Sequence, residues 1–281
     1  MSDRLQLFLM NLLPKNTVSR LAGRFAGSGF SRLFIPYYIR KFNINLHEVE
    51  KRWEEYPSLV EFFIRRLKEE ARPIDRSAGS IISPVDGKVA QLGAIEDGNL
   101  VQAKGVFFTV EELLGGDRKR AERYRGGTFL TVYLSPTDYH RIHMPLDGAV
   151  NGSTYVPGTL FPVNPFGVRA VNGLFAKNER LITYFDTEAG EVALVKVGAT
   201  IVGSVKVEYD ELAGTNIKGG RLEQKELTDG PRYAKGEEVA RFEFGSTIIL
   251  LFEPGQVVLS DQLQNEASVR MGEKIGQVVG R

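Results

Sequence analysis

The sequence predicts an α+β fold in which an N-terminal block of helices precedes a mostly antiparallel β core. Helix-capping residues and helical spacing of apolar side chains occur before Pro73. From residue 80 onward, segments rich in Val, Ile, Thr, Tyr and Phe alternate with turns. Elements segregated in this way along the chain are typical of α+β folds. We therefore divide the 281 residues into a helical region, 1–76, and a β-rich core, 77–281.

Two helices are expected near the end of the helical region. Asn45 can cap a helix that runs to about Tyr56, and Ser58 to Glu61 form a capping box for a second helix. In the core, the apolar and β-branched segments predict strands at 128–134, 150–156, 180–185, 191–207 and 239–252.

Residues 4–41 mix large apolar side chains with basic ones, and no acidic residue lies between Asp3 and Glu48. No apolar run approaches the roughly 20 residues needed to span a bilayer. A signal peptide is also not expected, because the first apolar stretch meets Pro14 without a small-residue cleavage site. The pattern favours helices that lie in a membrane interface and bind anionic lipid. A helical hairpin packed on the core is the alternative.

Composition excludes several kinds of site. The chain has no cysteine, so it has no disulfide, thiol nucleophile or Cys-ligated metal. A net charge of +1 argues against general nucleic-acid binding. The chain has three histidines, His47, His140 and His143, and two histidines in one motif are too few ligands for zinc. We therefore expect no metal.

The triplet Gly245-Ser246-Thr247 interrupts the last long β segment, from Val239 to Phe252. A glycine and polar residues between two apolar strands break the local pattern, and such breaks are expected at functional sites. A β-bulge with a solvent-facing serine is the ordinary interpretation.

Three separate residues could supply acid-base chemistry to this serine. Asp86 lies at the corner of the turn SPVDGKV, where an Asp before Gly usually caps its own turn. His140 and His143 would face opposite sides of a strand unless a turn brings them together. Asp86, His143 and Ser246 could form a relay in which His takes the Ser proton and Asp fixes the imidazole tautomer. Because strand residues rather than an exposed elbow flank Ser246, its target could be its own backbone.

The chain contains, in this order, the blocks SPVDGKV, YLSPTDYHRIHMP, YVPGTLFPVNP, LFAKNER and VGATIVGSV, followed by Phe244-Gly245-Ser246-Thr247. In these blocks and their order the sequence resembles the bacterial, membrane-associated phosphatidylserine decarboxylases. The family's LGST processing motif is present as Phe244 to Thr247, with Phe in place of Leu and the reacting pair intact. The resemblance runs from the N-terminal basic helices to the C-terminus. It implies a core related to barrel-sandwich hybrids and a homodimer.

The resemblance also implies a mechanism. His143, oriented by Asp86, would deprotonate Ser246, which attacks the carbonyl of Gly245 and splits the chain into a β chain (1–245) and an α chain (246–281). Ser246 would become a pyruvoyl group, the covalent cofactor, whose carbonyl forms a Schiff base with the substrate amine and accepts the electrons released with CO2. His140 is the candidate for the proton transfer that completes decarboxylation.

The sequence therefore predicts a self-processing lyase that makes phosphatidylethanolamine from phosphatidylserine. We expect it at the cytoplasmic side of the cell membrane, peripherally bound to anionic lipid. Two alternatives stay open at this point. A serine hydrolase would use the same relay on an external ester or peptide, and a carrier or binding module would be chemically inert.

Overall fold

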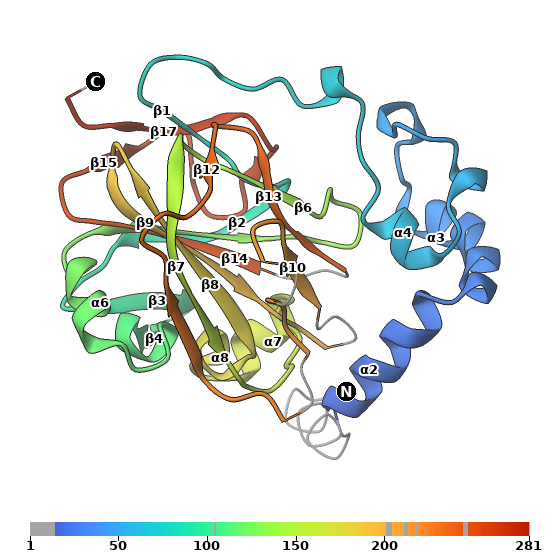
Figure 1. Cartoon of the computed structure of the whole chain (residues 1–281), viewed down its shortest axis with the longest axis horizontal. Helices are drawn as coiled ribbons and strands as arrows, with labels where there is room; N and C mark the ends of the chain where they lie inside the picture. The colour runs from blue at the N-terminus through green and yellow to red at the C-terminus, as the bar shows by residue number, and fades with distance from the viewer. Residues whose placement is uncertain are drawn as a thin grey trace.

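The computed structural model describes residues 15–103, 105–200, 204–210, 213–216, 219–243 and 247–280. Gly245 and Ser246, together with residues 4–14 of the predicted membrane region, lie outside these described residues. A β-rich body fills one side of the molecule and the N-terminal helices cover the other (Figure 1). Every pairing between the named strands is antiparallel, so the α+β prediction is confirmed.

The N-terminal region folds into short helices and 3-10 turns. In chain order these are α2 (Lys15–Ala26), η1 (Gly29–Phe34), α3 (Ile35–Phe42), η2 (Leu46–Glu48), η3 (Trp53–Glu55), α4 (Leu59–Phe63) and η4 (Glu69–Ala71). As predicted, Ser58 caps α4, where its hydroxyl accepts a 3.3 Å hydrogen bond from the Glu61 amide. Among the described helices, none combines the length and the apolar character needed to cross a bilayer.

The predicted helix from Asn45 to about Tyr56 is wrong. Asn45 does cap a helical turn, through a 3.2 Å bond from the His47 amide, but that turn ends at Glu48. Directly after it the chain is extended, because Val49 pairs with Leu67 and the backbones of residues 48–50 and 66–68 exchange hydrogen bonds. Before Tyr56 only the single 3-10 turn η3 follows. Tertiary pairing thus overrides a local helix signal.

The β core contains one large sheet, two small ones and a hairpin. The large sheet runs in the order β11 (Glu223–Glu226), β7 (Gly148–Val156), β8 (Arg180–Thr187), β9 (Gly190–Val197), β14 (Thr247–Phe252), β5 (Thr128–Tyr133), β2 (Gly87–Ala94) and β16 (Ser268–Val269), and β12 (Arg232–Tyr233) also pairs with β7. One small sheet has the strand order β10 (Val205–Val207), β13 (Glu238–Phe242) and β6 (Arg141–His143). The other has the order β1 (Ser80–Ile82), β17 (Lys274–Val278) and β15 (Val257–Leu259). The hairpin is β3 (Asn99–Ala103) with β4 (Val106–Thr109), and the core helices are α5 (Val110–Leu113), α6 (Arg118–Arg123), α7 (Pro165–Ala170) and α8 (Leu174–Lys177).

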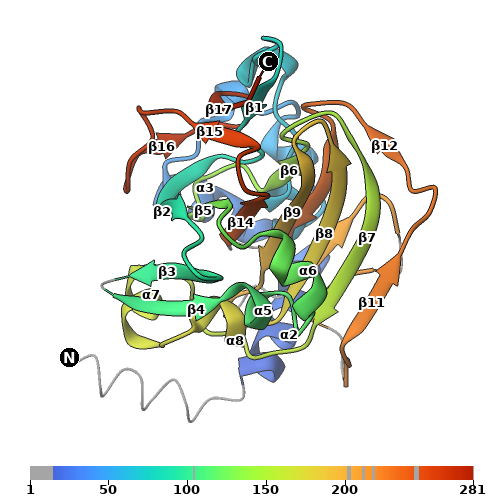
Figure 2. The same ribbon diagram turned by 90° about the vertical axis from the view of Figure 1, so that its left-hand side faces the viewer.

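Strand β14 lies in the middle of the large sheet and is buried on both faces. Ile248, Leu250 and Phe252 enter one hydrophobic cluster, with residues of the small sheets. Ile249 and Leu251 enter the other, which the β3–β4 hairpin and helices α5 to α8 cover (Figure 2). A strand covered on both faces needs a continuous apolar run, which explains the sequence from residue 248 to 252. The predicted strand at 239–252 is therefore two strands, β13 and β14, in different sheets.

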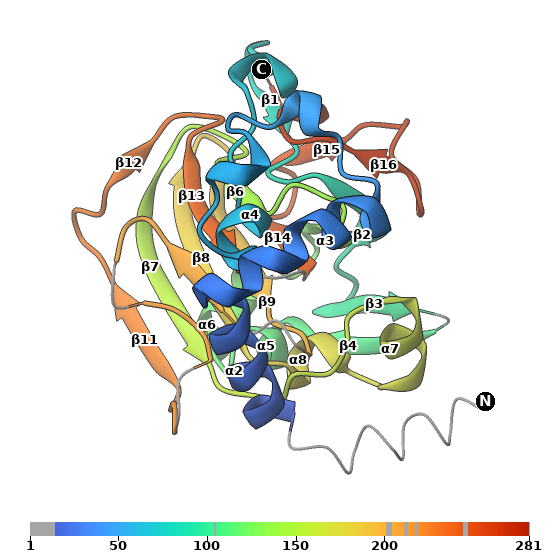
Figure 3. The same cartoon turned by 90° about the vertical axis from the view of Figure 1, so that its right-hand side faces the viewer.

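The N-terminal helices have a separate apolar cluster, which includes Ile35, Phe62 and Phe63. They attach to one end of the β core, in front of β6 and β13 in the view of Figure 3. The contacts include hydrogen bonds: Tyr38 donates to the Pro136 carbonyl, and Arg141 Nε donates to the Ile64 carbonyl at 2.8 Å. The segment from Ser135 to Arg141 therefore contacts the N-terminal helices on one side.

Candidate active site

The end of β13 and the start of β14, on either side of the predicted Gly245–Ser246 bond, indicate where the candidate site lies. Phe242, the last residue of β13, donates its amide to the His140 carbonyl at 2.9 Å. Thr247, the first residue of β14, pairs with Tyr133 of β5, which in turn pairs with Lys88 of β2. Asp86 lies two residues before Lys88 in the chain. The described neighbours of the predicted Gly245–Ser246 bond thus lie beside the two sequence motifs that contain Asp86 and His140.

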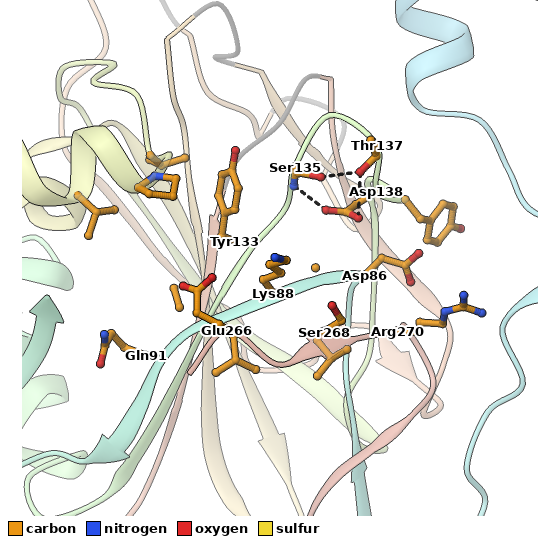
Figure 4. Close-up of a pocket in the computed structure, with 18 of the residues that line it drawn as sticks. Asp86, Lys88, Gln91, Tyr133, Ser135, Thr137, Asp138, Glu266, Ser268 and Arg270 are labelled. Carbon is orange, nitrogen blue, oxygen red and sulfur yellow. Dashed lines mark hydrogen bonds between the residues drawn. The ribbon is translucent and has the colours of Figure 1, made fainter. Parts of the chain in front are cut away.

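A pocket of about 810 Å³ opens at this end of the sheet. Its walls come from four places: the N-terminal region, the strands β2, β5 and β16, the segment after β5, and residues of β3 and α7. Figure 4 shows Asp86, Lys88, Tyr133 and Asp138 around this space. Residues that are distant in the sequence therefore share one cavity large enough for a small ligand.

Asp86 is fixed by a cation and a backbone amide. Arg72 binds its carboxylate with both Nε and Nη2, at 2.5 to 3.0 Å, and Arg72 Nη1 also binds Glu48 at 2.9 Å. The Met271 amide donates to Asp86 Oδ1 at 2.8 Å. All of these side chains are largely buried, and charge-assisted, bidentate pairs of this kind are strong and directional. These hydrogen bonds hold the carboxylate in one orientation.

His143 is held in one tautomer. Its Nδ1 lies 2.8 Å from the Gly236 carbonyl, and its Nε2 lies 3.0 Å from the Tyr139 hydroxyl. Because a carbonyl only accepts, Nδ1 carries the proton and Tyr139 donates to the Nε2 lone pair. Burial lowers the pKa of His143 below 6.5, so the ring is a neutral base. Its lone pair points to Tyr139 in this structure.

Asp86 and His143 are neighbours without a direct hydrogen bond. The His143 amide donates to the Pro84 carbonyl at 2.9 Å, which brings β6 alongside the turn that carries Asp86. The hydrogen bonds of the carboxylate go to Arg72 and Met271, and Gly236 and Tyr139 orient the imidazole. The structure thus brings the segments of the two predicted residues together, and their relay with Ser246 stays a prediction.

His140 is fully buried and its ring has a free nitrogen. The Nδ1–H donates to the Asp138 carbonyl at 2.8 Å, and the ring packs on Phe63 with centroids 4.1 Å apart. Its Nε2 is inaccessible to solvent and has no hydrogen-bond partner in the described part of the chain. Burial lowers the pKa of His140 to about 3, and the charge of Arg65 adds to the effect. An unpaired buried acceptor is rare in folded proteins and calls for an explanation.

The sequence alone did not single out Tyr139, Arg72 or Arg65. Tyr139 stands inside a motif that was noticed, but its contact with His143 depends on the bend before β6. The Arg72–Asp86 pair joins residues 14 positions apart in different regions of the fold. The hydroxyl of Thr247 is also buried and unpaired among the described residues. The described residues contain no group of three or more His, Asp or Glu side chains able to hold a metal ion.

A second surface feature lies on α2, η1 and α3. Large apolar side chains are exposed there: Leu21, Phe25, Phe30, Leu33, Phe34 and Tyr37. Leu33 and Phe30 are 70% and 63% exposed, and the rings of Phe25, Phe30 and Phe34 pack edge to face. Contiguous exposed apolar patches of this kind mark interaction surfaces. We call these six residues the apolar face.

Comparisons with known proteins agree on one family. Residues 59–277 match the family model for phosphatidylserine decarboxylase. A phosphatidylserine decarboxylase proenzyme of Brevibacillus brevis is 49% identical over 98% of both chains. Proenzymes of the same name from Myxococcus xanthus and Idiomarina loihiensis are 43% and 41% identical, each over 99% of this chain and 100% and 97% of their own length.

Proposed function

Because the chain belongs to the phosphatidylserine decarboxylase family, we propose that it matures by cutting itself between Gly245 and Ser246 and then works at the pocket beside His140. The enzyme decarboxylates phosphatidylserine to phosphatidylethanolamine and CO2. The observation that carries the proposed site is the buried, unpaired Nε2 of His140, directly after the pocket-lining Asp138 and Tyr139.

In the self-cleavage step, His143 Nε2 is the proposed base. It takes the proton of the Ser246 hydroxyl after Tyr139 gives up its hydrogen bond, and the serine oxygen attacks the Gly245 carbonyl. The peptide bond becomes an ester. Loss of the Ser246 Cα proton then breaks the Cβ–O bond, so that Gly245 leaves as a carboxylate and residue 246 becomes dehydroalanine. Addition of water and loss of ammonia give the pyruvoyl end of the α chain (246–281), paired with the β chain (1–245).

In turnover, the pyruvoyl group derived from Ser246 supplies a carbonyl that takes up the electrons released with CO2. The surrounding residues fit it, since Thr247 and His140 both offer unpaired buried polar atoms next to the break. We assign the proton transfers to His140 Nε2, which accepts a proton from the substrate ammonium and returns it to the carbon that loses CO2. A neutral imidazole is required for the first of these transfers, and the low pKa of His140, about 3, provides it.

The apolar face is the proposed membrane contact. Its six exposed apolar residues are interspersed with Arg24, Arg32 and Arg40, which suits a peripheral attachment to anionic lipid on the cytoplasmic side of the cell membrane. Attachment at this face would bring the pocket, which the same N-terminal region helps to enclose, toward the lipid head groups. A homodimer, a core related to the barrel-sandwich hybrids, and the division into regions 1–76 and 77–281 belong to the same proposal.

The test separates maturation from turnover. His140→Ala should still cut itself, as measured by intact mass, yet release CO2 from phosphatidylserine about 10²- to 10⁴-fold more slowly. His47→Ala, which removes an exposed histidine, is the matched control and should behave as wild type in both assays. Cyanoborohydride should attach substrate to the small fragment of wild type. Full activity of His140→Ala would remove this residue from the mechanism, and fatty acyl chains esterified to Ser246 would support a serine hydrolase instead.

A further inference from the structure

Arg65 is a buried cation on the wall of the pocket. The residue is 4% exposed, and its guanidinium lies over the ring of Phe62. It donates to two carbonyls, that of Thr137 at 3.1 Å and that of Phe63 at 3.4 Å. A guanidinium has five N–H donors, so three of them make no hydrogen bond within the described part of the chain. The Nε is among these three.

Its charge is not balanced by a carboxylate. Among the described residues no Asp or Glu lies within ion-pair distance of Arg65, whereas the nearby Arg72 binds Asp86 and Glu48, and Arg141 binds Glu238. Buried charges in proteins are normally paired, because leaving water is costly for an ion. A buried guanidinium with spare donors at a cavity is therefore a site for an anion.

Arg65 and His140, the proposed proton carrier, both contact Phe63 and the backbone of residues 137–138. Arg65 binds the carbonyl of Thr137, and His140 binds the next carbonyl along the chain, that of Asp138. Phe63 packs on the His140 ring and offers its carbonyl to Arg65. The guanidinium and the imidazole are thus fixed to the same short segment, so an anion bound by Arg65 would lie close to the reacting atoms.

We propose that Arg65 binds the phosphodiester of the substrate head group. The substrate carries two anions, the phosphodiester and the carboxylate. The carboxylate loses its charge as CO2 leaves, so a cation bound to it would stabilise the reactant more than the transition state and would slow the reaction. The phosphodiester keeps its charge throughout, and a cation bound to it strengthens binding without this penalty. Arg65 is accordingly a substrate-binding residue that determines KM.

This inference rests on the proposed site at His140, and the experiment distinguishes the two. Arg65→Gln removes the charge, Arg65→Lys keeps it, and Arg66→Gln is the matched control, since Arg66 is a neighbouring arginine whose side chain is 65% exposed. Each variant is first checked for self-cleavage by mass and for thermal stability. Binding of glycerophosphoethanolamine, which has the phosphodiester and no carboxylate, and of L-serine, which has the carboxylate and no phosphate, is measured by calorimetry.

We expect Arg65→Gln to cut itself, to bind glycerophosphoethanolamine about 10- to 100-fold more weakly, and to raise KM for phosphatidylserine similarly with little change in kcat. Serine binding should not change, Arg65→Lys should be intermediate, and Arg66→Gln should match wild type. Loss of serine binding alone would assign Arg65 to the carboxylate. Unchanged binding and KM, or no binding of glycerophosphoethanolamine to wild type, would leave Arg65 with only its two structural hydrogen bonds and overturn the inference. Failure of the proposed site itself would appear separately, as activity in His140→Ala.

Discussion

The protonation of His140 makes a quantitative prediction about stability. The folded protein holds this imidazole neutral down to a pKa of about 3, whereas its ordinary value is 6.5. Between these two pH values the unfolded chain binds a proton that the folded chain does not. The free energy of unfolding must therefore fall as the pH falls through this window, and it is not affected by His140 above it.

The size of the effect follows from the shift. One proton changes the free energy of unfolding by about 1.36 kcal/mol per pH unit, so lowering the pH from 7 to 5 should cost about 2 kcal/mol on account of His140. The residue is completely buried, so solvent does not screen the effect. Other ionisable groups contribute to the same pH dependence. The quantity to compare is therefore the difference between the chain with His140 and the His140→Gln variant.

The assay is urea unfolding at pH 7 and pH 5, in a Ser246→Ala background that we expect to remain one chain. The chain with His140 should lose about 2 kcal/mol more than His140→Gln between the two pH values. Equal losses would show that His140 is protonated in the folded state or becomes exposed to water. In that event the neutral imidazole assigned to proton transfer would be wrong.

Two other predictions concern the ion pairs of Arg72 and the apolar face. Arg72→Ala leaves Asp86 and Glu48 without their cation, so it should destabilise the protein by about 3 to 5 kcal/mol in urea unfolding and slow self-cleavage. An unchanged cleavage rate would show that Asp86 has no part in maturation. Leu33→Glu, at the most exposed position of the apolar face, should weaken binding to anionic vesicles in flotation assays while self-cleavage continues. Equal vesicle binding would place the membrane contact elsewhere.

The sequence correctly predicted features that depend only on residues close together in the chain. The Ser58 cap is present because a serine before an apolar run satisfies the first amides of a helix regardless of context. The break at Gly245 was visible because the flanking strands are so regular. The helix expected after Asn45 failed because pairing between Val49 and Leu67, which are distant in sequence, determines the backbone there.

The sequence suggested candidate site residues, whose roles stay predictions, but it did not reveal their contacts. Asp86, His140 and His143 stand in motifs that can be read from the chain. In the structure the His143 amide bonds to the Pro84 carbonyl, and His140 directly follows Asp138 and Tyr139, which line the same pocket as Asp86. The partners of these residues could not be read in the same way. Arg72 reaches Asp86 from another region, and the bend before β6 brings Tyr139 onto His143. Such contacts depend on how whole elements pack, which residue spacing does not encode.

Cleavage of the chain's own backbone at Ser246 is the step on which the proposed activity depends, and intact mass spectrometry of the purified protein detects it. We expect the 281-residue chain to yield two pieces, the smaller one of 36 residues (281 minus 245) with an N-terminus that lacks a free amine. Ser246→Ala should give a single mass. A wild-type protein that stays whole, or a small fragment with a free amino terminus, would show that the chain does not mature in this way.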